Sequence, residues 1–93
     1  MTRIKVREVV FDKWNIKHIK KHDVSVEEII EAGTNLIYHK KTYKGRYLAV
    51  GRSGERIISF VIKRKSSVRY YLISARDAAK KERMKAYEKE RNK

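Results

Sequence analysis

Residues 56–63 read Arg-Ile-Ile-Ser-Phe-Val-Ile-Lys, which is the most apolar stretch of the 93-residue chain. β-Branched and aromatic side chains dominate this stretch, and strands are enriched in both. A short apolar run bounded by charged residues favours a strand inside a sheet over one at its edge. We therefore expect residues 56–63 to form the central strand of a sheet.

The segments on both sides of this stretch continue the strand pattern. A Ser-Gly pair at residues 53–54 fits a two-residue hairpin loop, and residues 46–51 form an expected strand before it. Residues 35–39 form a further expected strand, followed by a polar turn. On the C-terminal side, two serines at residues 66–67 mark a turn before a strand at residues 68–74. These four strands should form an antiparallel meander.

The N-terminal part of the chain predicts a strand and then a helix. Residues 4–11 are rich in β-branched side chains and should form an opening strand. Asp12 can then cap a short helix at residues 13–21. We expect Trp14 and Ile19 to point from this helix into the core.

Two further helices have recognisable boundaries. Ser25 and Glu28 have the spacing of a capping box, and Gly33 fits the position just after the end of that helix. Residues 78–91 consist mainly of strong helix formers, and Ser74 is the expected cap of this last helix. Its apolar stripe is narrow, so it should dock by one thin face.

The expected order of elements is β-α-α-β-β-β-β-α in a single domain over residues 1–93. This order predicts an α+β fold, with an antiparallel sheet and helices packed on one face.

The charge of the chain is strongly unbalanced. Twenty-five Lys and Arg residues face eleven Asp and Glu residues, so the net charge is +14. Such an excess indicates a polyanionic partner. Between residues 39 and 69 the basic side chains alternate with apolar ones, so we expect them to be mounted on folded structure as one basic concave face. Residues 23–38 form an acidic island.

Composition also excludes several classes of protein. There is no cysteine, so disulfides, cysteine-ligated metal sites and thiol nucleophiles are excluded. No apolar run is long enough to span a bilayer, and the first residues do not form a secretory signal. We therefore expect a cytoplasmic protein with no membrane partner.

A histidine pair could in principle bind a metal ion. His18 and His22 are one helical turn apart, a spacing that can place both rings on one ion. No obvious third ligand accompanies them, so a polar helix face is the favoured interpretation. We expect no metal and no cofactor.

Two other groups of residues suit nucleic-acid binding. Tyr47, Tyr70 and Tyr71 share the expected strands with basic residues, and such rings can stack on RNA bases while guanidinium groups hold phosphates. Tyrosine is also a common strand and core residue, so this pattern alone is not decisive. At residues 73–83 a strand meets a helix start, where free N–H groups and basic side chains favour anions. Ordinary capping beside a solvated cationic face explains the same residues.

Two blocks of sequence resemble the signatures of the BrnT family of toxins. In the first, residues 11–25, Phe-Asp leads to His-Ile-Lys-Lys-His-Asp-Val-Ser, and Glu27 and Glu28 follow. In the second, residues 73–88, Ile-Ser-Ala-Arg-Asp-Ala is followed by Lys-Glu-Arg and Tyr-Glu. The blocks lie near opposite ends, so the resemblance covers nearly the whole chain.

The resemblance implies a RelE-like fold and a ribonuclease toxin of a type II toxin–antitoxin pair, a hydrolase that cleaves RNA and so inhibits translation and growth. It also implies a BrnA-type antitoxin partner with a ribbon-helix-helix part, through which the toxin–antitoxin complex binds operator DNA.

Metal-independent RNA cleavage needs cations that stabilise the pentacoordinate phosphorane. We expect Arg76 and Arg83 to hold the scissile phosphate, with Lys63 or Arg64 presented from the end of the central strand. Further RNA contacts are expected from basic and aromatic residues elsewhere on the chain. These are Arg46, Arg56, Arg69, Tyr71 and Lys80.

The same reaction needs a base for the ribose 2′-OH and an acid for the leaving oxygen. Glu82 or His22 is the expected base. Tyr71 or Tyr87 could donate a proton or stack a base.

Two other classes of function fit the charge. A non-catalytic nucleic-acid-binding module would retain RNA or DNA, with an affinity that falls steeply with salt, and would release no cleavage products. A protein-binding module would instead bind an acidic chain.

Overall fold

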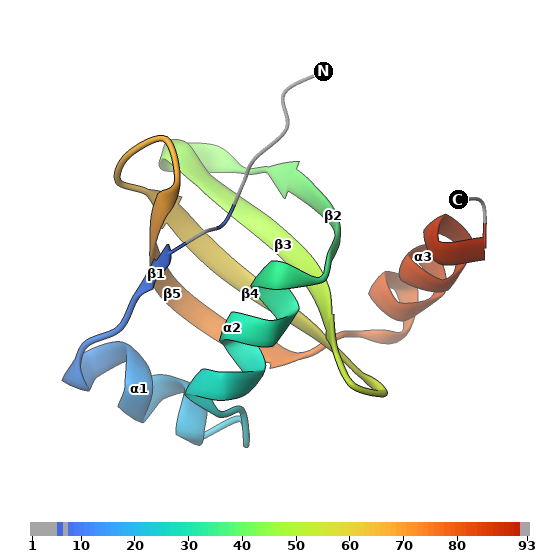
Figure 1. The fold of residues 1–93 in the computed structure, drawn as a ribbon, viewed down its shortest axis with the longest axis horizontal. Helices are drawn as coiled ribbons and strands as arrows, with labels where there is room; N and C mark the ends of the chain where they lie inside the picture. The colour runs from blue at the N-terminus through green and yellow to red at the C-terminus, as the bar shows by residue number, and fades with distance from the viewer. Residues whose placement is uncertain (1–5, 7, 92–93) are drawn as a thin grey trace.

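The computed structural model describes residue 6 and residues 8–91. Within these residues, three helices and five strands follow one another in the predicted order, with one short 3-10 turn added (Figure 1). The elements are β1 (Glu8–Val10), α1 (Lys13–Lys20), α2 (Val26–Thr34), β2 (Leu36–Lys41), the turn η1 (Tyr43–Gly45), β3 (Arg46–Ser53), β4 (Arg56–Arg64), β5 (Arg69–Asp77) and α3 (Lys80–Arg91). Within the described residues, no helix combines the length and apolar character that crossing a membrane requires.

The five strands form one sheet in the order β1-β5-β4-β3-β2, so β4 lies at its centre as predicted. Strands β2 to β5 form the expected antiparallel meander. The sheet as a whole is mixed, because β1 pairs in parallel with β5. The N–H of Glu8 donates to the carbonyl of Val68 at 3.1 Å, so β1 begins beside the start of β5 and runs along it toward α1. Of the opening strand predicted at residues 4–11, residues 4, 5 and 7 lie outside the described part.

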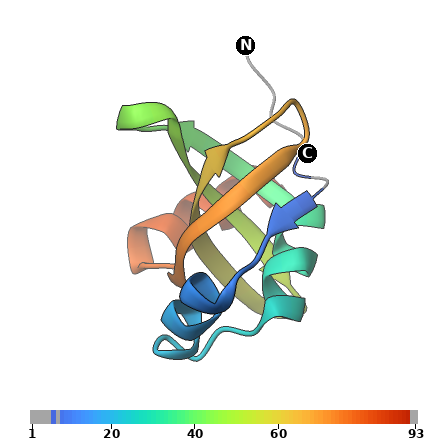
Figure 2. The ribbon, with the colours of Figure 1, turned by 90° about the vertical axis from the view of Figure 1, so that its left-hand side faces the viewer.

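The helices cover both faces of the sheet, whereas the sequence predicted one covered face (Figure 2). Helices α1 and α2 bury the main core, which includes Ile19, Ile29 and Phe60. Helix α3 lies against the opposite face. There, Ala86 and Ala78 form a smaller cluster with Val50 and Ile57 of the sheet.

The position of α3 follows from where β5 ends. Strand β5 continues to Asp77, three residues beyond the predicted strand end, so Ser74 lies inside the strand and does not cap the helix. The chain leaves the sheet at Ala78 and Ala79, and the N–H of Ala79 donates to the Glu82 carboxylate at 2.8 Å. Helix α3 then buries only Ala86 within its length, which confirms its thin docking face.

The starts of α1 and α2 are confirmed. Both carry complete capping boxes, one between Asp12 and Asn15 and the other between Ser25 and Glu28. Helix α2 continues through the predicted stop at Gly33 and ends one residue later. Ile19 is buried as predicted, but Trp14 is 75% exposed. The inward position that was predicted for Trp14 is taken by the buried side chain of Asn15.

Asn15 should be a major anchor of α1. Its buried amide donates to the carbonyls of Val10 and Leu72, both at 3.0 Å. Asn15→Ala should lower the free energy of unfolding by about 2 kcal/mol, because one buried and one partly buried hydrogen bond are lost. Urea denaturation measures the loss. Asn35→Ala is the matched control, since the exposed Asn35 amide makes a longer contact of 3.3 Å with Arg52; equal losses in both variants would contradict this role.

Candidate active site at the junction of β5 and α3

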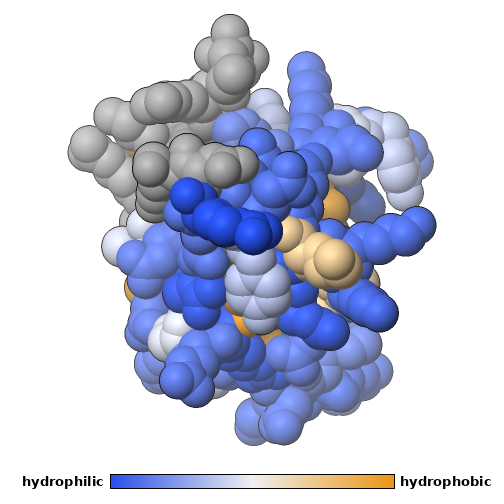
Figure 3. Space-filling view, turned by 90° about the vertical axis from the view of Figure 1, so that its right-hand side faces the viewer, coloured by the Kyte–Doolittle hydropathy of each residue, from blue (hydrophilic) through white to orange (hydrophobic). Residues whose placement is uncertain are grey.

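The face of the sheet that carries α3 is called the open face here. Phe60, Tyr47 and Ala75 point into the main core on the other side, so the alternation of strands places their immediate neighbours on the open face. A register shift in β5 between Leu72 and Ser74 moves the alternation by one residue, so Tyr70 and Leu72 also face the core, while Arg69 and Tyr71 lie on the open face. The described side chains on this face include Ser59 together with a basic and aromatic set: Tyr38, Lys40, Arg46, Lys63, Arg69, Tyr71 and Arg76. Seen from the α3 side, the surface is dominated by hydrophilic residues (Figure 3). The structure thus gathers basic side chains from four neighbouring strands, β2 to β5.

Glu82, in the first turn of α3, is the centre of a hydrogen-bonded cluster at one end of the open face. Its Oε1 accepts bonds at 2.8 Å from the Arg76 guanidinium, the Ser59 hydroxyl and the Ala79 N–H. Its Oε2 accepts a second bond from Arg76 at 3.1 Å. The Glu82 side chain is only 15% exposed, while that of Arg76 is 47% exposed. The carboxylate therefore holds the guanidinium at two points and leaves part of it open to solvent.

The electrostatics of this cluster keep Glu82 ionised. Burial raises the pKa of its carboxyl, but the hydrogen bonds from Arg76, Ala79 and Ser59 outweigh burial, so the pKa lies below its usual value. The bond to Glu82 in turn raises the pKa of Arg76. Both groups are charged at neutral pH, and the pair is fixed by its geometry.

Tyr38 of β2 joins the cluster from the side, a position that sequence reasoning missed. Its hydroxyl donates to the main-chain carbonyl of Glu82 at 3.5 Å. Burial raises the pKa of Tyr38, and the Glu82 charge adds to this effect while Arg76 opposes it. The ammonium group of Lys85 lies 4.9 Å from the ring centre. Only the register of β2 against β3 brings Tyr38 here, and no local motif marks it.

The other residues predicted on α3 lie near the cluster or beyond it. The guanidinium of Arg83 donates to the carbonyl of Ala78 at 2.7 Å, so it is bound to the main chain at the same junction. Lys80 is exposed at the first position of the helix. Tyr87 lies farther along α3 and is 48% exposed.

Lys63 and Arg64 lie at the opposite end of β4. Arg76 is paired with Ser59, and Lys63 lies four residues farther along the same strand, which is about 13 Å. Lys63 is on the open face, whereas alternation turns Arg64 toward the face of α1 and α2. A shallow hollow at this end is lined by basic residues that include Lys41, Lys63, Arg64 and Lys65. The structure therefore separates these two residues from Arg76.

Three of the predicted RNA contacts lie on the open face. Arg46 is paired with Lys63 in the sheet, and its Nε is buried without a hydrogen-bond partner among the described residues. Arg69 forms an exposed ion pair with Glu8 at 3.2 Å. Tyr71 is half-buried, and its hydroxyl donates to the Asp12 carboxylate at 2.8 Å.

Arg56 differs from them, because it lies on the face of α1 and α2. Its guanidinium contacts Glu28 at 2.8 Å and Asp77 at 2.6 Å, and it donates to the carbonyl of Asp23 at 2.8 Å. These contacts connect α2 and the turn before it to the start of β4 and the end of β5. Its side chain serves the fold.

The contacts of Arg56 should make stability depend on acid pH. The hydrogen bond from Arg56 lowers the pKa of both Glu28 and Asp77 below their ordinary values of 4.5 and 3.8. Because the folded-state values are lowered, this stabilisation is complete above those ordinary values and is lost as the pH falls through the lowered ones. Arg56→Met should therefore cost most at neutral pH and progressively less toward pH ~3. Chemical denaturation across this pH range measures the effect. Arg91→Met, at the end of α3, is the control, and a cost for Arg56→Met that stays constant with pH would contradict the prediction.

His22 is not brought to the cluster. It follows α1 on the other side of the sheet, where its ring lies 5.8 Å from that of His18. Within residue 6 and residues 8–91, no three His, Cys, Asp or Glu side chains lie close enough together to hold a metal ion.

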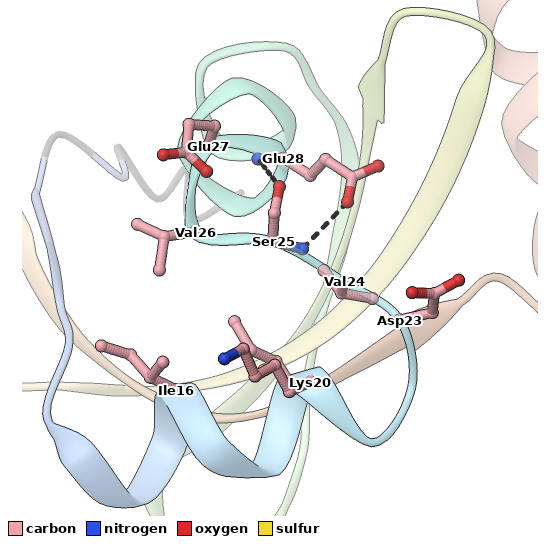
Figure 4. A pocket seen from close by; sticks show the side chains of 9 residues that line it. Ile16, Lys20, Asp23, Val24, Ser25, Val26, Glu27 and Glu28 are labelled. Carbon is pink, nitrogen blue, oxygen red and sulfur yellow. Dashed lines mark hydrogen bonds between the residues drawn. The ribbon is translucent and has the colours of Figure 1, made fainter.

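A separate hollow lies between α1 and α2 (Figure 4). Ser25 and Glu28 at its rim are hydrogen-bonded to each other in the capping box. The rest of the lining is partly apolar, as at Ile16 and Val26, and partly charged, at Lys20, Asp23 and Glu27. Because Ser25 and Glu28 are used by the start of α2, the cluster around Glu82 remains the better candidate site.

The fold is similar to that of the Brucella abortus ribonuclease toxin BrnT, as seen in its crystal structure. The TM-score is 0.62 at 23% sequence identity, and the match covers 84% of this chain and 100% of that one. The likeness confirms the BrnT-like α+β fold that the resemblance of the two sequence blocks implied. No family model and no curated protein matches the chain.

Proposed function

We propose that this protein is the ribonuclease toxin of a type II toxin–antitoxin pair, and that it inhibits translation and growth by cleaving RNA. The BrnT-like fold and the two sequence blocks support this proposal. The observation that carries it is the partly exposed guanidinium of Arg76, which the largely covered carboxylate of Glu82 holds in place on a basic sheet face.

Arg76 is the proposed residue that stabilises the transition state. A guanidinium has five N–H donors. Among the described residues, Glu82 and the carbonyl of Asp77 accept hydrogen bonds from three of these donors. The other two donors remain for a phosphate. Fixed donors of this kind stabilise the charge that develops on a phosphorane without reorganisation during the reaction. Arg83 would add charge at the same junction.

Glu82 is proposed as a positioning residue for Arg76. Its lowered pKa and the four hydrogen bonds it accepts leave it a weak proton acceptor. His22 lies on the other side of the sheet and is left out of the proposed site. Tyr71 on the open face and Tyr87 on α3 are the proposed groups for proton donation or base stacking.

The remaining basic side chains would bind the RNA backbone at phosphates other than the scissile one. Arg46, Lys63 and Arg69 share the open face with Arg76, and Lys80 flanks it at the start of α3. Phosphates along a single strand could contact these side chains in turn. Arg64 faces the other side of the sheet but lines the hollow at the end of β4 together with Lys63, so it would contact the RNA where the strand passes this end of the sheet.

The proposed partner is an antitoxin of the BrnA type with a ribbon-helix-helix part, through which the complex would bind operator DNA. An acidic antitoxin surface over the open face would block the RNA track. It would also relieve the self-repulsion of a chain with a net charge of +14.

Incubation of the purified protein with bulk RNA tests the function. Cleavage products should form with and without a chelator, and expression of the chain alone should stop growth until the antitoxin is co-expressed. If the folded protein retains RNA with a steep salt dependence but releases no products, it is a non-catalytic nucleic-acid-binding module.

A further inference from the structure

The outer face of α1 exposes an aromatic stack that the fold does not use. Trp14, the only tryptophan in the chain, is 75% exposed. Its ring lies nearly parallel to that of His18, at 11° with 6.3 Å between the ring centres, and the ring of His22 follows at 5.8 Å from His18. Leaving an indole in water forgoes the stabilisation that its burial would give. The exposure therefore suggests a ligand.

The surroundings of Trp14 are basic. A hollow on this face is lined by Lys13, Trp14, Lys17, His18 and Lys21, and it contains no acidic side chain. Asp12, the nearest acid before the helix, is occupied by the N–H of Asn15 and the hydroxyl of Tyr71. We call the five lining residues, Lys13, Trp14, Lys17, His18 and Lys21, the α1 platform. Its charge is complementary to a polyanion.

The α1 platform is separate from the proposed active site. Helix α1 packs on the core face of the sheet, whereas α3 covers the open face (Figures 1 and 2). Arg76 lies on the open face as well, because its neighbour Ala75 points into the core. A ligand on the platform would therefore contact a part of the molecule remote from the Glu82 cluster.

We propose that the α1 platform binds single-stranded RNA, with a base stacked on the Trp14 indole and the backbone phosphates held by Lys13, Lys17 and Lys21. Exposed aromatic rings beside lysines form the usual platform for single strands, because every base offers a flat face and every linkage a charge. The lining supplies stacking and point charges, without the deep apolar pocket that anchors a protein hot spot. The proposal rests on the proposed function only in taking RNA as the ligand, and it gives the RNA a second contact outside the active site.

Fluorescence of Trp14 tests the platform directly, because no other tryptophan contributes. The probe is a short 2′-O-methyl oligouridine, which cannot be cleaved through its 2′ position. Its addition should quench the emission in a saturable way, and added salt should weaken the binding. The triple variant K13Q/K17Q/K21Q should lose at least tenfold in affinity by this signal.

Retention of the labelled oligonucleotide on a filter gives a second readout that does not need the tryptophan. Trp14→Ala should weaken retention about tenfold. Ile30→Ala, which truncates another exposed apolar side chain on α2, should leave it unchanged. Both positions are exposed, so both variants should fold, and circular dichroism checks this.

The possible outcomes separate the platform from the proposed function. Absence of quenching by the oligonucleotide, or quenching only by an acidic peptide such as polyglutamate, overturns the RNA platform even if the enzyme cleaves RNA. Saturable quenching in a protein that cleaves no RNA keeps the platform and removes the nuclease. Because the probe is uncleavable, neither result depends on turnover.

Discussion

Replacement of Arg76 by alanine should lower the rate of RNA cleavage by about a hundredfold to a thousandfold, the usual effect of removing one fixed donor to a developing anion. The fold should survive, because the Arg76 side chain is half exposed and Glu82 keeps its bonds from Ser59 and Ala79. Single-turnover cleavage of a defined RNA measures the effect, and growth inhibition on expression should be lost with it.

Further variants distinguish the effect of the positive charge of Arg76 from the effect of its fixed position. Arg76→Lys keeps the charge but cannot bind Glu82 at two points, so it should recover little of the activity. Glu82→Gln should mainly lower the catalytic rate, because the Arg76 guanidinium is no longer held in its position. The affinity for RNA should be nearly unchanged, because the positive charge of Arg76 is still present. Arg91→Ala removes an equal charge at the far end of α3 and should keep full activity. Full cleavage by a folded Arg76→Ala protein would remove this site.

The sequence predicts strands well where apolar side chains are dense, and less well where a boundary depends on packing. The apolar side chains around Phe60 must be covered on both faces, so β4 lies at the centre of the sheet. The capping box of Ser25 and Glu28 defines the start of α2. Helix α3 shows the opposite case. Its stripe is so thin that only Ala86 is buried, so no periodicity indicates which face of the sheet it covers.

Trp14 shows a different limit. Hydrophobicity alone predicts that a tryptophan in an amphipathic helix points inward. The polar Asn15 takes the buried position next to it, since its amide donates to the main-chain carbonyls of Val10 and Leu72. A scale of side-chain polarity cannot anticipate such a bond across the fold.

Only part of the candidate site could be predicted from the sequence. Arg76 and Glu82 are close in the chain and lie in one of the blocks that resemble BrnT toxins, so local reasoning found both. Ser59 and Tyr38 come from other strands and depend on register, which a single sequence does not reveal. Lys63 lies at the end of β4, as predicted, but Arg76 is paired with Ser59 four residues earlier, so the register of β4 against β5 keeps the two side chains apart.

Gly51→Ala should cause the largest loss of stability, because α2 crosses β3 at this residue. A Cβ atom at Gly51 would overlap the backbone carbonyl of Ala32, which is fully buried in α2. A backbone atom cannot rotate away as a side chain can, so the whole helix must shift from the sheet. Overpacking of this kind costs about 3 kcal/mol. In a domain of this size, that lowers the melting temperature by more than about 10 °C.

Gly33→Ala is the matched control one residue from the same crossing, and it should change stability in the other direction. A Cβ atom there would meet Val6 at 3.4 Å, which is ordinary contact, and Gly33 lies inside α2. Alanine in place of glycine in a helix gains up to about 1 kcal/mol. Thermal unfolding followed by circular dichroism compares the two variants. If Gly51→Ala melts as high as Gly33→Ala, the close approach of α2 to β3 is not a feature of the molecule in solution; if Gly51→Ala does not fold at all while Gly33→Ala does, the crossing carries the larger part of the stability of this small domain.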